Sequence, residues 1–128
     1  MQNERKLAAI LSADVAGYSR LMGDDEQATL ATLTEYREVM REQIAAHHGG
    51  VVDAPGDALL AEFPSAVEAV ESAVEIQNAL ALRNDALAEH RRMRVRIGIN
   101  LGDVIEQENA LYGDGVNVAA RLEAMCEP

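Results

Sequence analysis

The sequence predicts an α+β fold in which helices cover one face of an antiparallel sheet. Strand-like and helix-like segments alternate along the chain, and short turn signals join neighbouring strand-like segments into hairpins. No repeat, linker or low-complexity segment interrupts this order. The 128 residues are 48% hydrophobic and 26% charged, which is typical of one soluble domain with a real core. We therefore expect residues 1–128 to form a single domain.

The first half of the chain predicts a strand, a long helix and a hairpin. Residues 6–14 form a mostly apolar run, as in a strand that is buried on both faces. Residues 51–63, with the sequence VVDAPGDALLAEF, predict two strands joined by a Pro-Gly turn. Between them, apolar residues recur at helical spacing: Leu30, Leu33, Tyr36, Met40 and Ile44.

The second half repeats this pattern with a helix, a hairpin and a last helix. A helix is expected from Pro64 onward, and residues 92–107 predict a hairpin that turns at Gly102 and Asp103. The apolar stripe of the first of these helices is Val67, Val70, Val74, Ile76 and Leu80. The stripe of the last is Val116, Ala119, Ala120 and Leu122. Because the chain stops at Pro128, where a helix would end, we expect a domain truncated at its C-terminus, with its last strands missing.

Charge and cysteine content narrow the classes of partner. The net charge of -11 would repel a phosphate backbone, so we expect no nucleic-acid partner. A phosphorylated ligand would need cations, a helix N-terminus or clustered arginines. The single cysteine, Cys126, excludes an internal disulfide, and no apolar run is long enough to span a membrane. These observations predict a cytoplasmic protein without a membrane segment.

Two aspartates stand where strands are expected to end. Asp14 closes the first strand and Asp57 lies at the tip of the first hairpin. Carboxylates from different strands suit Mg²⁺ or Mn²⁺, and these ions in turn suit phosphoryl chemistry. The segment that follows Asp14 would present backbone N–H groups to phosphate oxygens. Its residues are Val15, Ala16, Gly17, Tyr18 and Ser19. On residue type alone, a strand-terminal aspartate is as often a turn residue.

The last helix contributes an amide and a guanidinium on one face. Asn117 and Arg121 are spaced i and i+4. The guanidinium could neutralise charge that develops on a transferring phosphorus group, and the amide could orient a sugar or a base. An exposed surface arginine is the competing interpretation.

Four strings in order and register resemble the catalytic domain of bacterial class III adenylate/guanylate cyclases. They are LAAILSADVAGYSRLMGDDE, GDALLAEF, RIGINLGDVI and YGDGVNVAARLEA, and together they run from about residue 6 to the C-terminus. The resemblance implies a ferredoxin-like α+β protomer and a head-to-tail homodimer with active sites in the shared cleft. It implies a lyase that converts ATP, or GTP, to the 3',5'-cyclic nucleotide and pyrophosphate in intracellular signal transduction.

The resemblance also implies a role for each candidate residue. Asp14 and Asp57 match the two aspartates that bind two Mg²⁺ or Mn²⁺ ions. Asn117 matches the asparagine that contacts the ribose region, and Arg121 matches the arginine that stabilises the transition state. Both would reach in from the partner chain, so a homodimer could build two equivalent sites.

Two positions depart from the adenylate cyclase pattern. Asp53 stands where adenylate cyclases typically carry a lysine, and Ala110 stands where they typically carry an aspartate. A carboxylate cannot donate to adenine, whereas it can accept from the N1–H and N2–H₂ groups of guanine, so a preference for GTP is open. A local turn role for Asp53 is an equal interpretation. A second hypothesis is a catalytically weak or inactive domain that serves dimerisation or nucleotide sensing.

Overall fold

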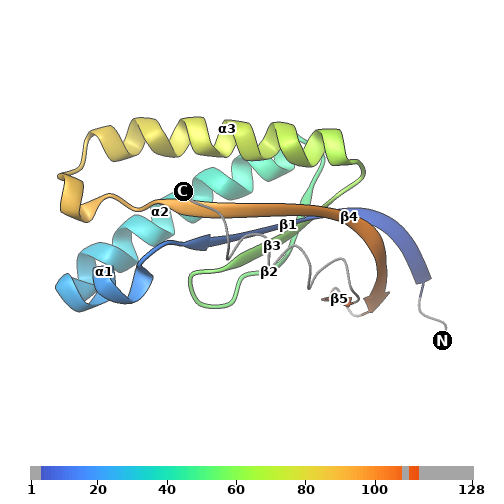
Figure 1. Ribbon diagram of the computed structural model, residues 1–128, viewed down its shortest axis with the longest axis horizontal. Helices are drawn as coiled ribbons and strands as arrows, with labels where there is room; N and C mark the ends of the chain where they lie inside the picture. Colours follow the sequence, from blue (N-terminus) through green and yellow to red (C-terminus); the bar gives the residue numbers. More distant parts are fainter. Residues whose placement is uncertain (1–3, 108–109, 113–128) are drawn as a thin grey trace.

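The part of the protein that the structure describes is built on one five-stranded antiparallel sheet. A computed structural model describes residues 4–107 and 110–112, and the side chains of residues 7–102. The strand order is β2-β3-β1-β4-β5, and α2 and α3 lie together over one face of the sheet (Figure 1). The strands are β1 Glu4–Val15, β2 Gly50–Asp53, β3 Leu59–Phe63, β4 Val95–Gln107 and β5 Ala110–Tyr112. The predicted α+β class, with an antiparallel sheet and helices on one face, is confirmed.

The two long helices, α2 and α3, begin at polar caps that the sequence supplies. The helices are α1 Tyr18–Asp24, α2 Glu26–Ala46 and α3 Ala66–Asp85, with a 3-10 turn η1 at Glu89–Arg91. Asp25 caps α2 by accepting a hydrogen bond from the Ala28 N–H at 3.0 Å, and Ser65 caps α3 through the Glu68 N–H at 3.2 Å. The expectation of one long helix missed α1, which ends at the residue that caps α2. The predicted last helix lies outside the described residues.

The central strand β1 is buried on both faces, as its apolar run predicts. Ala9, Leu11, Ala13 and Val15 belong to the main core beneath the helices, together with Tyr36, Met40, Ile44 and Phe63. The residues that alternate with them, Ala8, Ile10 and Ser12, are also buried. Asp14 follows Ser12 in this alternation, so its side chain belongs to the sheet face opposite the helices.

The face that α3 buries differs from the predicted apolar stripe. Ile76 and Leu80 are buried as expected, but Val67, Val70 and Val74 are 66%, 51% and 53% exposed. The buried positions on the first turns are instead Ala69 and Ser72, both at 0%. Small side chains at these two positions let the helix lie close to the sheet, and this rotates the three valines toward solvent. Leu30 of α2, at 44% exposure, was also expected in the core.

The predicted turn at Gly102 and Asp103 is wrong. β4 continues through both residues, which pair with Ala8 and Leu7 of β1. A Gly-Asp pair favours a turn locally, but β1 begins at Glu4 and offers β4 a partner as far as Glu106. The chain instead reverses between β4 and β5, where Gln107 pairs with Ala110.

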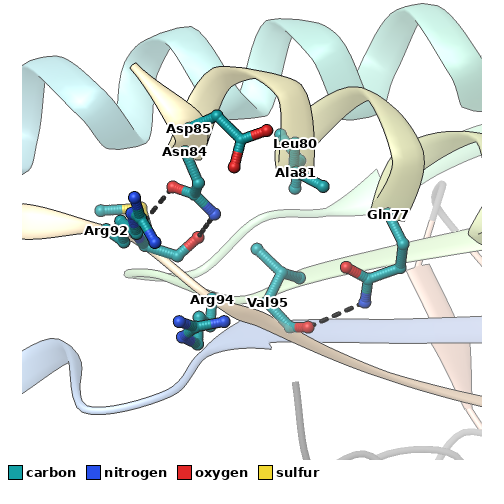
Figure 2. A pocket seen from close by; sticks show the side chains of 9 residues that line it. Gln77, Leu80, Ala81, Asn84, Asp85, Arg92, Arg94 and Val95 are labelled. Carbon is teal, nitrogen blue, oxygen red and sulfur yellow. Dashed lines mark hydrogen bonds between the residues drawn. The ribbon is translucent and has the colours of Figure 1, made fainter. Parts of the chain in front are cut away.

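Polar side chains of α3 fasten the helix to the start of β4. The Asn84 amide donates to the Met93 carbonyl at 3.0 Å and accepts from the Met93 N–H at 3.0 Å. Gln77 Nε2 donates to the Val95 carbonyl at 2.9 Å, and Figure 2 shows the Asn84 and Gln77 side chains pointing from α3 toward this segment. Tyr36 OH donates to Asn84 Oδ1 at 2.6 Å. Burial, reinforced by Glu35 and opposed by Arg83, raises the pKa of Tyr36, so its hydroxyl stays a donor.

Gly49 is required by close packing rather than by backbone conformation. A Cβ at this position would lie 2.5 Å from Phe63 Cε2 and 2.9 Å from Ile44 Cγ2, both of which belong to fully buried side chains. A Cβ at the neighbouring Gly50 would meet no atom within 4 Å.

We expect Gly49→Ala to destabilise the protein by about 1–3 kcal/mol, the usual cost of forcing extra volume into a packed core. The matched Gly50→Ala substitution should change the free energy of unfolding by well under this amount. Urea unfolding followed by circular dichroism measures both. Equal stabilities for the two variants would contradict this account of Gly49.

Candidate functional site

The end of β1 brings the two candidate metal ligands together. Asp14 is the penultimate residue of β1 and belongs to the sheet face opposite α2 and α3. Asp57, 42 residues further along the chain, accepts a hydrogen bond from the Val15 N–H through Oδ2 at 3.1 Å. The carboxylate of Asp57 therefore lies against the backbone that carries Asp14.

The loop between β2 and β3 directs Asp57 toward β1. The Ala58 N–H donates to the Pro55 carbonyl at 2.9 Å, which closes a tight turn over residues 55–58. Gly56 has a φ of 57°, a left-handed conformation that glycine adopts without strain. The predicted Pro-Gly turn is thus present, and Asp57 is the residue directly after its left-handed glycine.

Arg96 holds Asp14 in place across the β1–β4 ladder. Asp14 and Arg96 are paired in register, and the guanidinium donates from Nε to Oδ1 at 2.9 Å and from Nη2 to Oδ2 at 3.0 Å. Both side chains are about three quarters buried, at 27% and 22% exposure for Arg96 and Asp14. Such a two-point contact fixes the plane of a carboxylate. The sequence interpretation missed Arg96; the signal was the alternation RMRVRIG, which puts arginines on the face opposite the buried Met93 and Val95.

The two carboxylates are suitable ligands for a divalent cation. Hard oxygen donors are what Mg²⁺ and Mn²⁺ prefer, and Mg²⁺ commonly takes one or two carboxylates while water and substrate phosphates complete its shell. Each Asp14 oxygen keeps a second lone pair beside the hydrogen bond from Arg96. Across residues 7–102 no group of three or more His, Cys, Asp or Glu is placed to hold a metal. The two aspartates therefore suit an ion whose remaining ligands come from water or from a bound substrate.

The segment expected to bind phosphate is partly committed to the protein's own hydrogen bonds. The Val15 N–H donates to Asp57, and the Ala16 N–H donates to the Arg94 carbonyl at 2.8 Å. Gly17, with a φ of 66°, is the residue before α1, and Tyr18 and Ser19 form the first turn of that helix. The N–H groups of a first helical turn have no partner inside the helix.

Asp53 makes a local contact. It is the last residue of β2, its side chain is exposed, and its Oδ1 accepts a hydrogen bond from the Ala54 N–H at 2.9 Å. This contact is the one that the turn interpretation predicts. Ala110 is the first residue of β5, while Asn117 and Arg121 lie outside the described residues.

Asp14 at the end of β1 and Asp57 in the β2–β3 turn, brought together at one edge of an antiparallel α+β sheet, are the pair of aspartates that the four sequence strings predict for a nucleotidyl cyclase. The family model described as "Adenylate and Guanylate cyclase catalytic domain" matches residues 1–128. The chain belongs to this family.

Individual relatives agree with this assignment. The chain is 49% identical over 125 residues to "Putative adenylate cyclase 3" of Rhizobium meliloti (strain 1021), a match that covers 97% of this chain and 21% of the relative. It is 30% identical over 123 residues to "Adenylate cyclase" of Streptomyces coelicolor, covering 95% of this chain and 30% of that protein. The chain thus spans about a fifth to a third of the length of these relatives.

A solved structure shares the fold closely. The adenylate/guanylate cyclase/hydrolase from Silicibacter pomeroyi superposes with a TM-score of 0.92 at 45% identity, over 99% of this chain and 74% of that one. Among the described residues no helix is long and apolar enough to cross a membrane.

The contact between Asp57 and Val15 can be tested directly by amide hydrogen exchange. We expect Asp57→Ala to speed exchange of the Val15 amide by about 5-fold, the loss corresponding to a net hydrogen bond of roughly 1 kcal/mol. Asp53→Ala is the matched control, because the Asp53 carboxylate contacts only its own turn, and it should leave the Val15 amide unchanged. If the Val15 amide exchanges at the same rate in Asp57→Ala, the hydrogen bond between Val15 and Asp57 does not protect this amide.

Proposed function

We propose that this chain is the catalytic domain of a metal-dependent nucleotidyl cyclase. It would convert a purine nucleoside triphosphate to its 3',5'-cyclic nucleotide and pyrophosphate, through attack of the ribose 3'-hydroxyl on the α-phosphate. The observation that carries the proposal is the convergence of Asp14 and Asp57 at the end of β1, within a chain that belongs to the cyclase family. We place the reaction in the cytoplasm, with cyclic nucleotide signalling as its purpose.

The chain's own residues would bind and orient the substrate. Asp14 and Asp57 are the residues that would hold two Mg²⁺ or Mn²⁺ ions. These ions would supply charge neutralisation for the triphosphate and activation of the 3'-oxygen. Arg96 keeps the Asp14 carboxylate in one orientation, so that little rearrangement is needed when a substrate arrives. The first turn of α1 would contact phosphate oxygens.

The remaining catalytic groups would come from a second copy of the chain. We propose a head-to-tail homodimer in which Asn117 contacts the ribose region and Arg121 stabilises the charge of the transition state. Since one sequence carries both half-sites, each dimer would hold two equivalent sites. The family resemblance of the segment YGDGVNVAARLEA supports this arrangement.

One observation favours a second candidate function, a catalytically weak or inactive domain that senses nucleotide or dimerises. Asp53, at the position expected to read the base, is exposed and hydrogen-bonded to its own turn. A site without a base-reading donor could bind triphosphate without efficient turnover. Calorimetry with a non-hydrolysable triphosphate and Mg²⁺ separates the two functions, because binding without product formation supports the second.

The primary test is a product assay on the purified full-length protein with Mn²⁺ and either ATP or GTP. We expect cyclic nucleotide from at least one substrate, and we expect Asp57→Ala to lower the rate by about 100-fold or more, as losses of central electrostatic groups do. Glu71→Ala, which removes an exposed acid on α3, is the control and should retain activity. Absence of product with both nucleotides would refute the enzymatic proposal, as would full activity in Asp57→Ala.

Base preference is tested by replacing Asp53. Asp53→Lys supplies the hydrogen-bond donor that adenine can accept, so we expect the ratio of ATP to GTP turnover to rise about 10-fold, the equivalent of one hydrogen bond of about 1.4 kcal/mol. Asp53→Ala removes the acid without adding a donor and should not raise ATP turnover. If both variants keep the wild-type ratio, Asp53 is a turn residue and does not contact the base.

A further inference from the structure

A cavity lies between α3 and the segment that leads into β4. Its volume is about 240 Å³, and Figure 2 shows the side chains that line it. Asp14 and Asp57 are not among the described residues of this lining, so the cavity is separate from the candidate site. Pockets for drug-sized ligands usually measure about 300–1,000 Å³, so this cavity suits a molecule smaller than a nucleotide.

The floor of the cavity is apolar. It is formed by Leu80, Met93 and Val95, which are 2%, 1% and 2% exposed and belong to the main core. Ala81 adds a small apolar side chain from the exposed face of α3. An aliphatic group placed in the cavity would therefore lie against the core of the protein, which favours its transfer from water.

Two amide side chains form a fixed polar wall. Asn84 exchanges two hydrogen bonds with the Met93 backbone, and Gln77 Nε2 donates to the Val95 carbonyl. These bonds hold both amides in one orientation. Within residues 7–102 they leave one N–H of Asn84 and the Oε1 of Gln77 without a hydrogen bond. The wall thus offers a donor and an acceptor to a ligand without rearrangement.

Opposite charges line the cavity without pairing. Asp85 is the last residue of α3, while Arg92 and Arg94 lie between η1 and β4. In the part of the chain with described side chains, no ion pair within 4.0 Å joins Asp85 to either arginine. Arg92 Nε donates to the Leu87 carbonyl at 3.2 Å, which leaves Nη1 and Nη2 for another partner. The cavity therefore separates a carboxylate from a guanidinium.

Arg91 anchors the segment that carries Arg92. It donates from Nη2 to Thr29 Oγ1 at 2.6 Å and from Nη1 to the Leu21 carbonyl at 3.4 Å. Thr29 is fully buried and itself donates to the Leu21 carbonyl at 2.8 Å. The η1 segment is thereby tied to the corner between α1 and α2, and Arg92 is held at the cavity without depending on a ligand.

We infer that this cavity binds a small aliphatic α-amino acid. Its ammonium group would bind Asp85, its carboxylate would bind Arg92, and its side chain would cover the apolar floor. A guanidinium suits a carboxylate because it can donate two parallel hydrogen bonds. A simple anion would also meet the acid, and a simple amine would also meet the arginines, whereas a zwitterion is complementary to both. The inference does not depend on the cyclase reaction.

The test is calorimetry of the full-length protein with L-leucine and with two analogues that each lack one charge. Isocaproate lacks the ammonium group and isoamylamine lacks the carboxylate. We expect leucine to bind the wild type about 10-fold more tightly than either analogue, the contribution of one charged hydrogen bond. Glycine, which lacks the aliphatic part, should also bind more weakly than leucine. Absence of saturable leucine binding in the millimolar range, or equal binding of all four molecules, would overturn the inference.

Substitutions assign each charge to one side of the cavity. Asp85→Asn should lower the affinity for leucine about 10-fold without weakening isocaproate, which has no ammonium group to lose a partner. Arg92→Gln should likewise lower the affinity for leucine about 10-fold without weakening isoamylamine. Glu75→Gln and Arg41→Gln remove exposed charges on α3 and α2, and these matched controls should keep the wild-type affinity. Wild-type affinity in both Asp85→Asn and Arg92→Gln would contradict the assignment.

A further variant and a second measurement locate the ligand. In the wild type, leucine should shift the side-chain amide NMR signals of Gln77 and Asn84. Ala81→Leu fills the cavity from the exposed face of α3 without changing any charge, so it should abolish these shifts. Thermal melting checks that each variant folds. Unshifted amide signals, or wild-type leucine affinity in Ala81→Leu, would overturn the inference. Since no turnover is measured, a failed cyclase assay would leave this result standing.

Discussion

The pairing of β1 with β4 is the constraint on which the site depends. Twelve consecutive residue pairs, from Glu4 with Glu106 to Val15 with Val95, hold the two strands in one register. A shift of one residue would turn every side chain to the opposite face of the sheet, and burial of β1 on both faces makes that shift costly. In this register Arg96 lies opposite Asp14, and the Arg94 carbonyl meets the Ala16 N–H. The register of β1 and β4 therefore determines both the orientation of the Asp14 carboxylate and the position of the segment that carries Arg94 and Arg96.

Side chains that are distant in sequence make further contacts around the end of β1, in addition to the pairing of β1 with β4. Asp57 reaches the strand end from the β2–β3 turn, and Arg91 reaches the α1–α2 corner from η1. Each contact satisfies a polar group that the fold has partly removed from water, and such groups are costly if left unpaired. The candidate metal ligands and residues 91–96, which carry four arginines, are therefore parts of one hydrogen-bonded framework around residues 14–17.

Local patterns in the sequence predicted the helices and strands well, but they predicted less well which face of each element is buried. The apolar run of β1, the two long helices and the Pro-Gly turn were all predicted, because each depends on residues close in the chain. The valine stripe of α3 and the turn at Gly102 failed because tertiary packing decided them: Ala69 and Ser72 permit close approach, and β1 extends far enough to pair with β4 as far as Glu106. The role of Arg96 was not predicted for the same reason, because it depends on a partner 82 residues away.

The anchor formed by Arg91 also bears on the order in which the protein assembles. It joins residues 62 and 70 positions apart, so the loop that it closes is among the long ones of this chain. Closing such a loop costs conformational entropy that local helices do not have to overcome, and contacts of this kind form after local ones. We expect α1, α2 and α3 to form before η1 docks. The α1–α2 corner would then receive the arginine only after these local helices have formed.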